Sequence, residues 1–159
     1  MARLLGIHIK NYRALADVRL GQVQYGNGTP LPRLTCLIGP NGSGKSTVLD
    51  AFGFVADCLL DGVEAACDKP WRGGFDRLRT QGEKGPISFE IFFEADDPAR
   101  PIVYQLLVDI VDGVPAAVEE TCRQRREGET RGKPYYFLKL KKGKGKAVSY
   151  THLTLPTKA

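Results

Sequence analysis

The sequence lacks any long apolar segment. No run reaches the roughly 18 apolar residues that a membrane-spanning helix requires. Lys10 and Arg13 interrupt the apolar residues near the N-terminus, so no signal peptide is expected. With 42% hydrophobic and 26% charged residues in 159 positions, the composition predicts one soluble domain with a core of its own. We therefore expect a cytoplasmic protein without membrane contact.

Closely spaced metal-binding residues are also missing. The four cysteines form no C-x-x-C pair, and neither of the two histidines is near them in the sequence. Structural zinc sites depend on such spacing. We therefore expect no zinc and reduced thiols at Cys36, Cys58, Cys67 and Cys122.

Positive charge is scarce over most of the chain and concentrated near its end. Residues 1–121 hold 12 Lys or Arg against 16 Asp or Glu, a net charge of −4, whereas residues 122–146 hold 10 against 2, a net charge of +8. Lys158 supplies the last positive charge of the total of +5. Such a block is typical of an exposed hairpin whose lysines keep it soluble and protect its edge. The alternative is a surface that binds the phosphates of DNA or RNA.

One short segment carries recognisable chemistry. Residues 39–46, GPNGSGKS, match the phosphate-binding loop G-x-x-x-x-G-K-[ST] at every position. The preceding residues 33–39, RLTCLIG, form a short apolar run that predicts a buried parallel strand. After the loop, Val48, Phe52, Val55 and Leu59 recur at helical spacing and predict one apolar face of a helix over residues 45–60. Gly62 is expected to end this helix in a left-handed conformation. This context favours a true nucleotide-binding loop over a chance match in a glycine-rich turn.

The chemistry of such a loop assigns a role to each of its residues. Glycines let the backbone wrap closely around a phosphate, with N–H groups and the helix dipole directed at the anion. Lys45, the expected catalytic residue, would reach the β- and γ-phosphates of ATP, Ser46 would be a ligand of Mg²⁺, and Thr47 would touch the α-phosphate. The expected nucleotide-binding residues are Gly39, Pro40, Asn41, Gly42, Ser43, Gly44, Lys45, Ser46 and Thr47.

The loop GPNGSGKST, placed after the N-terminal segment IHIKNYRAL, resembles the heads of the RecF, structural-maintenance-of-chromosomes and OLD ATPases. More narrowly, it is similar to bacterial AAA-family ATPases related to that group, over residues 3 to about 147. The resemblance implies an α/β P-loop NTPase fold of the ATP-binding-cassette type. It places Asn11, Tyr12 and Arg13 near the nucleotide and makes Arg13 a candidate phosphate contact. Arg13 fits equally well as a solvated turn residue between strands over residues 4–9 and 16–20.

These heads carry an inserted antiparallel sheet, and residues from about 86 to 142 have the corresponding pattern. The segments PISFEIFFEA, RPIVYQLLVDIV, VPAAVEETCRQRR and YYFLKLK are strand candidates, and Asp112-Gly113 predicts a hairpin turn. Ile87, Phe89, Ile91 and Phe93 alternate and should share one face of the sheet. We interpret the aromatic residues of these strands as core and sheet residues, with a base-stacking surface as the alternative.

Several parts of a cassette-type ATPase have no counterpart in the sequence. An apolar strand ending in Asp-Glu, which would hold Mg²⁺ and activate the attacking water, is missing, and so are an LSGG-type signature and the late switch histidine. The chain is thus interpreted as the N-terminal lobe of a head domain. We expect ATP hydrolysis only in the intact parent protein, in a homodimer of heads, and negligible turnover from this chain alone.

The last residues suggest a reason for the missing parts. Residues 148–157, VSYTHLTLPT, agree with the translation of a transposon adapter used in sequencing libraries. We therefore interpret residues 1–147 as native and residues 148–159 as a non-native tail, with a native polar tail as the alternative.

Three functions remain in competition. The first is ATP hydrolysis that drives conformational change in a larger assembly, in DNA repair or phage defence. The second is a P-loop small-molecule kinase or a GTPase, although the sequence has no N-K-x-D segment for guanine. The third is a nucleic-acid-binding module that uses the basic hairpin.

Overall fold

The computed structural model describes residues 2–26, 28–129, 132–142 and 144–147. The proposed non-native tail, residues 148–159, lies outside the described residues. Among the described helices, none is long and apolar enough to cross a membrane.

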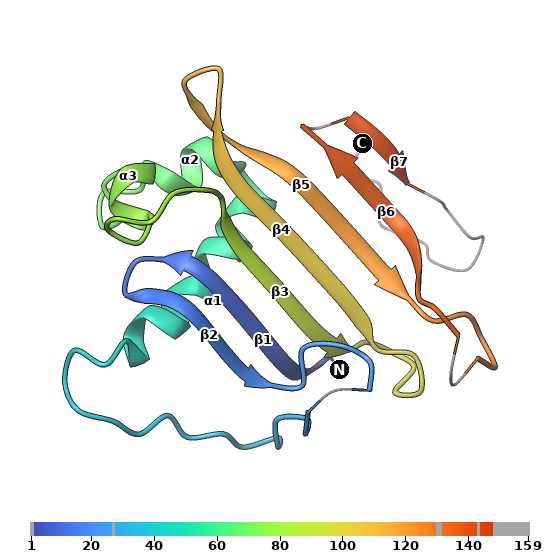
Figure 1. The fold of residues 1–159 in the computed structure, drawn as a ribbon. Helices are drawn as coiled ribbons and strands as arrows, with labels where there is room; N and C mark the ends of the chain where they lie inside the picture. Colours follow the sequence, from blue (N-terminus) through green and yellow to red (C-terminus); the bar gives the residue numbers. More distant parts are fainter. Residues whose placement is uncertain (1, 27, 130–131, 143, 148–159) are drawn as a thin grey trace.

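The described strands form a single seven-stranded antiparallel sheet (Figure 1), in the order β2-β1-β3-β4-β5-β6-β7. Every pair of neighbours is antiparallel. The strands are β1 (Arg3–Tyr12), β2 (Leu15–Gly21), β3 (Ile87–Glu94), β4 (Ile102–Val111), β5 (Val114–Gln124), β6 (Tyr135–Lys141) and β7 (Lys144–Ala147). The four strand candidates of residues 86–142 are thus observed as strands, and β1 and β2 extend the same sheet.

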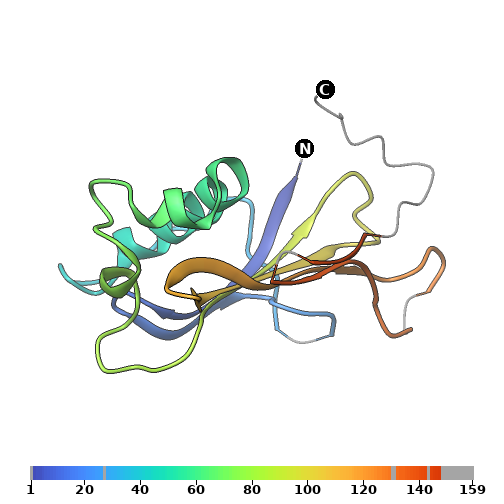
Figure 2. The ribbon, with the colours of Figure 1, turned by 90° about the horizontal axis from the view of Figure 1, so that it is seen from above.

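The helices lie on one side of this sheet (Figure 2). α1 (Lys45–Asp61) is the long helix that follows the phosphate-binding loop, and α2 (Val63–Cys67) and α3 (Phe75–Leu78) are short. Both short helices lie in the glycine-rich residues 62–82, and helices of four or five residues are too short to show periodicity in a sequence.

The core lies between α1 and the sheet. The predicted alternation in β3 is confirmed: Ile87 and Phe89 are fully buried in this core, and Ile91 and Phe93 pack against it. Tyr12, Phe54 and Phe89 form an aromatic cluster with ring centroids 5.3–5.7 Å apart. The buried residues of α1 are Val48, Ala51, Phe54 and Val55. This cluster packs the middle of α1 against β1 and β3.

The predicted helix over residues 45–60 is confirmed, but its buried face differs from the prediction. Leu59 is 59% exposed and Phe52 is only half-buried, whereas Phe54 is fully buried. Gly62 does end the helix with φ 91°, yet its ψ of 161° is extended rather than left-handed helical. Gly62 also precedes α2 directly, so the chain turns into a second helix there.

The parallel strand predicted over residues 33–39 is wrong. These residues are not part of the sheet, and Leu34 and Ile38 are 89% and 92% exposed. An apolar run indicates a buried strand only if neighbouring strands pair with it. No described strand does so, because the sheet ends at β2 on one side and at β7 on the other. Among the described residues the sheet therefore has no parallel pair, unlike the α/β order expected.

The hairpin turn predicted at Asp112-Gly113 is confirmed. Both residues have positive φ, 52° and 84°, and they join β4 to β5 directly. Two consecutive positive φ values are typical of a type I′ turn, whose twist matches that of the adjoining strands. The Asp-Gly pair was therefore a reliable signal.

Candidate functional site

The phosphate-binding loop leads directly into the first turn of α1. Gly42 and Gly44 have φ of 82° and 89°, a conformation that L-residues with a Cβ rarely adopt. A Cβ on Gly44 would also lie only 3.0 Å from Cδ2 of Leu15 on β2. Gly44 is therefore required both by its backbone angle and by the close approach of β2.

The ammonium group of Lys45 lies over this loop. Its Nζ donates to the carbonyl oxygens of Gly39 at 2.7 Å and Pro40 at 2.6 Å, and to Ser43 Oγ at 3.3 Å. All three acceptors are neutral. The loop thus holds a positive charge that no described carboxylate pairs with.

The N-terminus of α1 has free capacity for an anion. Gly44 occupies the N-cap position and provides no side-chain hydrogen bond, and the first turn contains no acidic residue. The first N–H groups of a helix have no partner within the helix, and the helix dipole places partial positive charge there. These donors, together with Lys45, fit the phosphates of a nucleotide.

Ser46 is the expected Mg²⁺ ligand and is exposed on the first turn of α1. Thr47, beside it, is half-buried. No group of three or more His, Cys, Asp or Glu residues gathers as a metal site in the described part of the chain. Mg²⁺ keeps several waters and commonly binds with phosphate oxygens. Ser46 therefore fits a metal that arrives with a nucleotide rather than one held by a protein cage.

Asn11 has a structural role that the sequence did not reveal. It is 7% exposed with φ 60°, and its Nδ2 donates to the carbonyls of Gly85 at 2.9 Å and Pro86 at 3.3 Å. Its Oδ1 accepts from the Thr80 N–H at 3.2 Å. Asn11 therefore fastens the chain between α3 and β3 to the end of β1.

Arg13 lies on the turn between β1 and β2, with φ 50°. Its Nε is 3.3 Å from Oδ2 of Asp50, and its Nη2 donates to the Trp71 carbonyl at 3.3 Å. The turn is brought to the phosphate-binding loop by the approach of Leu15 to Gly44. Arg13 is thus on the turn, as one interpretation held, but it is half-buried against α1 rather than solvated.

Asp50 and Arg72 form an ionic network behind the loop that the motif search missed. Arg72, with a side chain only 2% exposed, contacts Asp57 at 2.5 Å and Asp50 at 3.6 Å. Hydrogen bonds from Lys69 and Arg72 hold the pKa of Asp57 below its usual range. Asp50, Asp57 and Asp61 lie on one face of α1, and this spacing in the sequence was the available signal.

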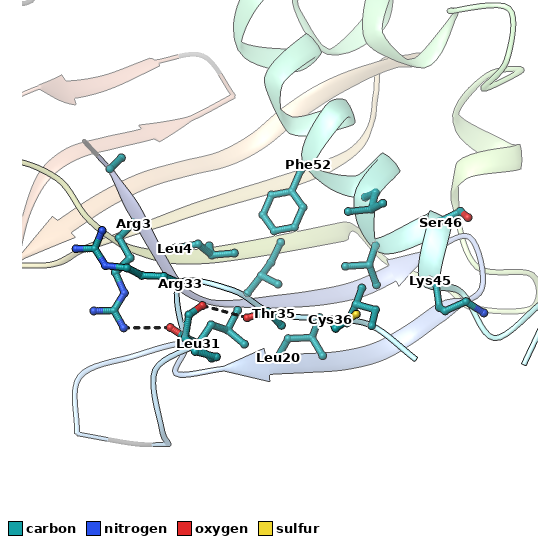
Figure 3. Close-up of a pocket in the computed structure, with 16 residues that line it drawn as sticks. Arg3, Leu4, Leu20, Leu31, Arg33, Thr35, Cys36, Lys45, Ser46 and Phe52 are labelled. Atoms are coloured by element: carbon teal, nitrogen blue, oxygen red, sulfur yellow. Dashed lines mark hydrogen bonds between the residues drawn. The ribbon is translucent and has the colours of Figure 1, made fainter. Parts of the chain in front are cut away.

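A groove of about 680 Å³ adjoins the loop (Figure 3). It lies between α1, the β1–β2 pair and the extended residues 31–37. Lys45 and Ser46 lie at one end and Arg3 at the other, where Arg3 Nη2 donates to the Leu31 carbonyl at 3.1 Å. Its apolar lining residues include Leu4, Ile7, Leu20, Val48, Leu49 and Phe52.

Comparison with known proteins agrees with the loop chemistry. A family model described as "AAA domain, putative AbiEii toxin, Type IV TA system" matches residues 34–143, which is more than half of the chain. A stretch of 26 residues, 16% of the chain, is 69% identical to Structural maintenance of chromosomes protein 1B of Mus musculus, and the Homo sapiens protein gives the same identity. The match spans about 2% of the length of these curated relatives.

Proposed function

This chain belongs to the AAA-domain family of P-loop ATPases, and we propose that residues 39–47 bind ATP together with Mg²⁺. One observation carries the proposal: an uncapped helix N-terminus and an ammonium group held by neutral acceptors meet at one loop. Both features leave positive charge available to a polyphosphate. Charge-assisted hydrogen bonds to phosphate are roughly twice as strong as neutral ones.

The residues of the loop divide the work between backbone and side chains. The N–H groups at the start of α1, with Gly39, Pro40, Asn41, Gly42, Ser43 and Gly44 shaping the loop, surround the β-phosphate. Lys45 exchanges its contacts with Gly39 and Pro40 for oxygens of the β- and γ-phosphates. Thr47 contacts the α-phosphate. The proposal thus predicts that Lys45 moves away from the loop carbonyls when nucleotide binds.

Ser46 would hold Mg²⁺ through its hydroxyl oxygen, and phosphate oxygens of the nucleotide and water would be the further ligands. The ion, when bound, neutralises charge that develops on the phosphates during transfer. Ser46 is exposed on the first turn of α1, next to Lys45, which supports this role.

Arg13 is the second proposed phosphate contact. Its turn lies beside Gly44 through Leu15, which supports a position near the nucleotide. Asp50 and the Trp71 carbonyl hold its guanidinium group. Since Asp50 is on α1, any shift of the first turns of this helix would change the reach of Arg13.

We propose hydrolysis for the intact parent protein rather than for this chain alone. The sequence contains no Asp-Glu-ended strand and no LSGG-type signature. These groups would come from further residues and from a second head, as in the RecF, SMC and OLD-like ATPases. The conformational change so driven would serve DNA repair or phage defence. Steady-state turnover by this chain is expected to be negligible.

Titration calorimetry with Mg²⁺ and ATP tests the binding proposal. The chain should bind with saturable heat, and Lys45→Ala should weaken binding at least tenfold, which corresponds to about 1.4 kcal/mol. Lys84→Ala is the matched control because Lys84 is an exposed lysine on the loop before β3 and is not part of residues 39–47. Equal ATP affinities for the unsubstituted chain and for Lys45→Ala would overturn the proposal.

A further inference from the structure

The hairpin of β6 and β7 carries a second concentration of positive charge. β7 is one edge strand of the sheet, and β2 is the other. In Figure 1 the hairpin lies at the edge opposite β2, away from the helices. Five lysines of this hairpin are exposed: Lys139, Lys141, Lys142, Lys144 and Lys146. This surface is separate from the loop that carries Lys45.

The register of the two strands places four of these lysines on one face. Lys139 is directly opposite Lys146, and Lys141 is directly opposite Lys144. Residues directly opposite each other point to the same side of a sheet, about 4.5–5.5 Å apart at Cβ. We call these four residues the lysine face. Like charges in this arrangement destabilise the hairpin, so the fold does not benefit from them.

The lysine face forms no ion pair within the described residues. None of its ammonium groups lies within ion-pair distance of a described carboxylate, although Glu119 is opposite Lys141 on β5. Elsewhere in the sheet, the same kind of charge is paired: Arg123 donates to Glu90 at 2.9 Å. The lysine face is therefore open to an external anion.

An aromatic side chain adjoins the lysine face. Tyr136 is 44% exposed, and Lys139 Nζ lies 5.2 Å from the centroid of its ring. Tyr136 is thus a residue of the sheet, as the aromatics of these strands were interpreted, but it is not part of the core. An exposed ring beside a row of cations is a pattern that suits stacking on a base while lysines contact the backbone.

We propose that the lysine face, with Tyr136, binds the phosphate backbone of a nucleic acid. Lysines on alternate strand positions repeat every 6.4–6.8 Å or so, and a nucleic acid presents a continuous row of phosphates to match them. An anionic membrane fits less well because peripheral binding usually adds inserted apolar side chains. The exposed described residues of 139–147 are lysine, glycine and alanine only.

Fluorescence anisotropy with a labelled 30-nucleotide single strand and its duplex tests the proposal. Four phosphate contacts predict an affinity loss of about 50-fold for the single strand, and about 150-fold for the duplex, between 50 and 200 mM salt. The double variant Lys139→Gln/Lys146→Gln should make the slope of log affinity against log salt concentration shallower, by the amount expected for the loss of about two phosphate contacts. The control variant Lys10→Gln/Lys84→Gln removes the same amount of charge outside the hairpin, and it should leave the salt dependence of the affinity unchanged. A circular dichroism spectrum confirms that each variant is folded.

Three further measurements complete the test. Lys141→Gln/Lys144→Gln, the other opposed pair, should repeat the effect of the first pair. Lys45→Ala should keep nucleic-acid binding, which separates the lysine face from the nucleotide loop. Four outcomes would each overturn the proposal. The first two are loss of nucleic-acid binding in Lys45→Ala and an equal change of salt dependence in the control variant Lys10→Gln/Lys84→Gln. The others are no binding at 50 mM salt, and binding to anionic phospholipid vesicles without binding to nucleic acid.

Discussion

The hydroxyl of Tyr12 donates a 2.6 Å hydrogen bond to Oδ2 of Asp50 and joins the end of β1 to α1. Tyr12 is fully buried, and its ring packs on Phe54 and Phe89. Asp50 follows Lys45 by five positions on the same helix, so this bond helps to fix the start of α1 beside the β1–β2 turn. The geometry of the phosphate-binding loop therefore depends on a contact outside the loop.

Tyr12→Phe should lower the free energy of unfolding by about 1–2 kcal/mol. The change removes a buried hydrogen bond to a carboxylate while the ring keeps its packing. Urea unfolding followed by circular dichroism measures the effect. Tyr136→Phe is the matched control, and its effect should stay within about 0.5 kcal/mol because Tyr136 is partly exposed. Equal free energies of unfolding for Tyr12→Phe and for the unsubstituted chain would show that the hydrogen bond does not anchor α1.

Stability should fall at alkaline pH. Burial, reinforced by Asp50, raises the pKa of Tyr12 above the ordinary tyrosine value of 10.0, and burial with Glu120 does the same for the pKa of Tyr104. Above pH 10 the unfolded chain loses these protons while the folded chain keeps them, so the free energy of unfolding decreases as pH rises. Each residue contributes up to about 1.4 kcal/mol per pH unit there.

Urea unfolding between pH 8 and pH 11 checks this prediction, and ultraviolet difference spectra report tyrosine ionisation in the folded chain. Tyr12→Phe should reduce the pH dependence. A constant free energy of unfolding across this range would contradict the pKa directions assigned to the two residues.

Arg72→Ala should lower the free energy of unfolding by about 1.5–3 kcal/mol, the range for hydrogen bonds that involve charged groups. Arg72 is buried and donates to Asp57 Oδ2 at 2.5 Å and to the Ala66 carbonyl at 3.0 Å, so its loss removes both bonds and leaves Asp57 with Lys69 as its remaining partner. Differential scanning calorimetry of Arg72→Ala and the exposed control Arg77→Ala measures the difference. A larger decrease in the free energy of unfolding for Arg77→Ala than for Arg72→Ala would contradict the stabilising role given to the ionic network of Arg72.

Gly44→Ala should weaken ATP binding about tenfold or more and cost about 1–2 kcal/mol of stability. The left-handed φ of 89° disfavours alanine, and the new Cβ would press on Leu15. Gly53→Ala is the control, because Gly53 lies inside the same helix with no contact closer than 3.7 Å to the added Cβ. It should stabilise the chain by about 0.5–1 kcal/mol. The same sign of effect in both variants would contradict this explanation.

The sequence predicted best those features that depend on a few neighbouring residues. The helix from Lys45 and the Asp112-Gly113 turn each follow from local backbone preferences. The alternation in β3 also sufficed to place Ile87, Phe89, Ile91 and Phe93 on one face, and that face meets the core around α1.

The features that were missed depend on distant partners. Residues 33–39 have the composition of a strand, but a strand needs a neighbour, and composition does not provide one. The resemblance placed Asn11 near the nucleotide, but its structural role depends on hydrogen bonds to residues 80–86, which are far from it in the sequence. Similarly, the residues next to Arg72 in the sequence do not indicate that its side chain will form ion pairs with Asp50 and Asp57 of α1.

The central claim is that the main-chain N–H groups at the start of α1, with Lys45, hold a polyphosphate. Amide chemical shifts of ¹⁵N-labelled protein, recorded during titration with Mg²⁺ and ATP, test it most directly. The account predicts that the largest shifts fall on residues 42–47, and that AMP, which lacks the β- and γ-phosphates, leaves these signals in place. Unmoved signals from residues 42–47 at saturating ATP, or identical shifts in Lys45→Ala, would contradict it.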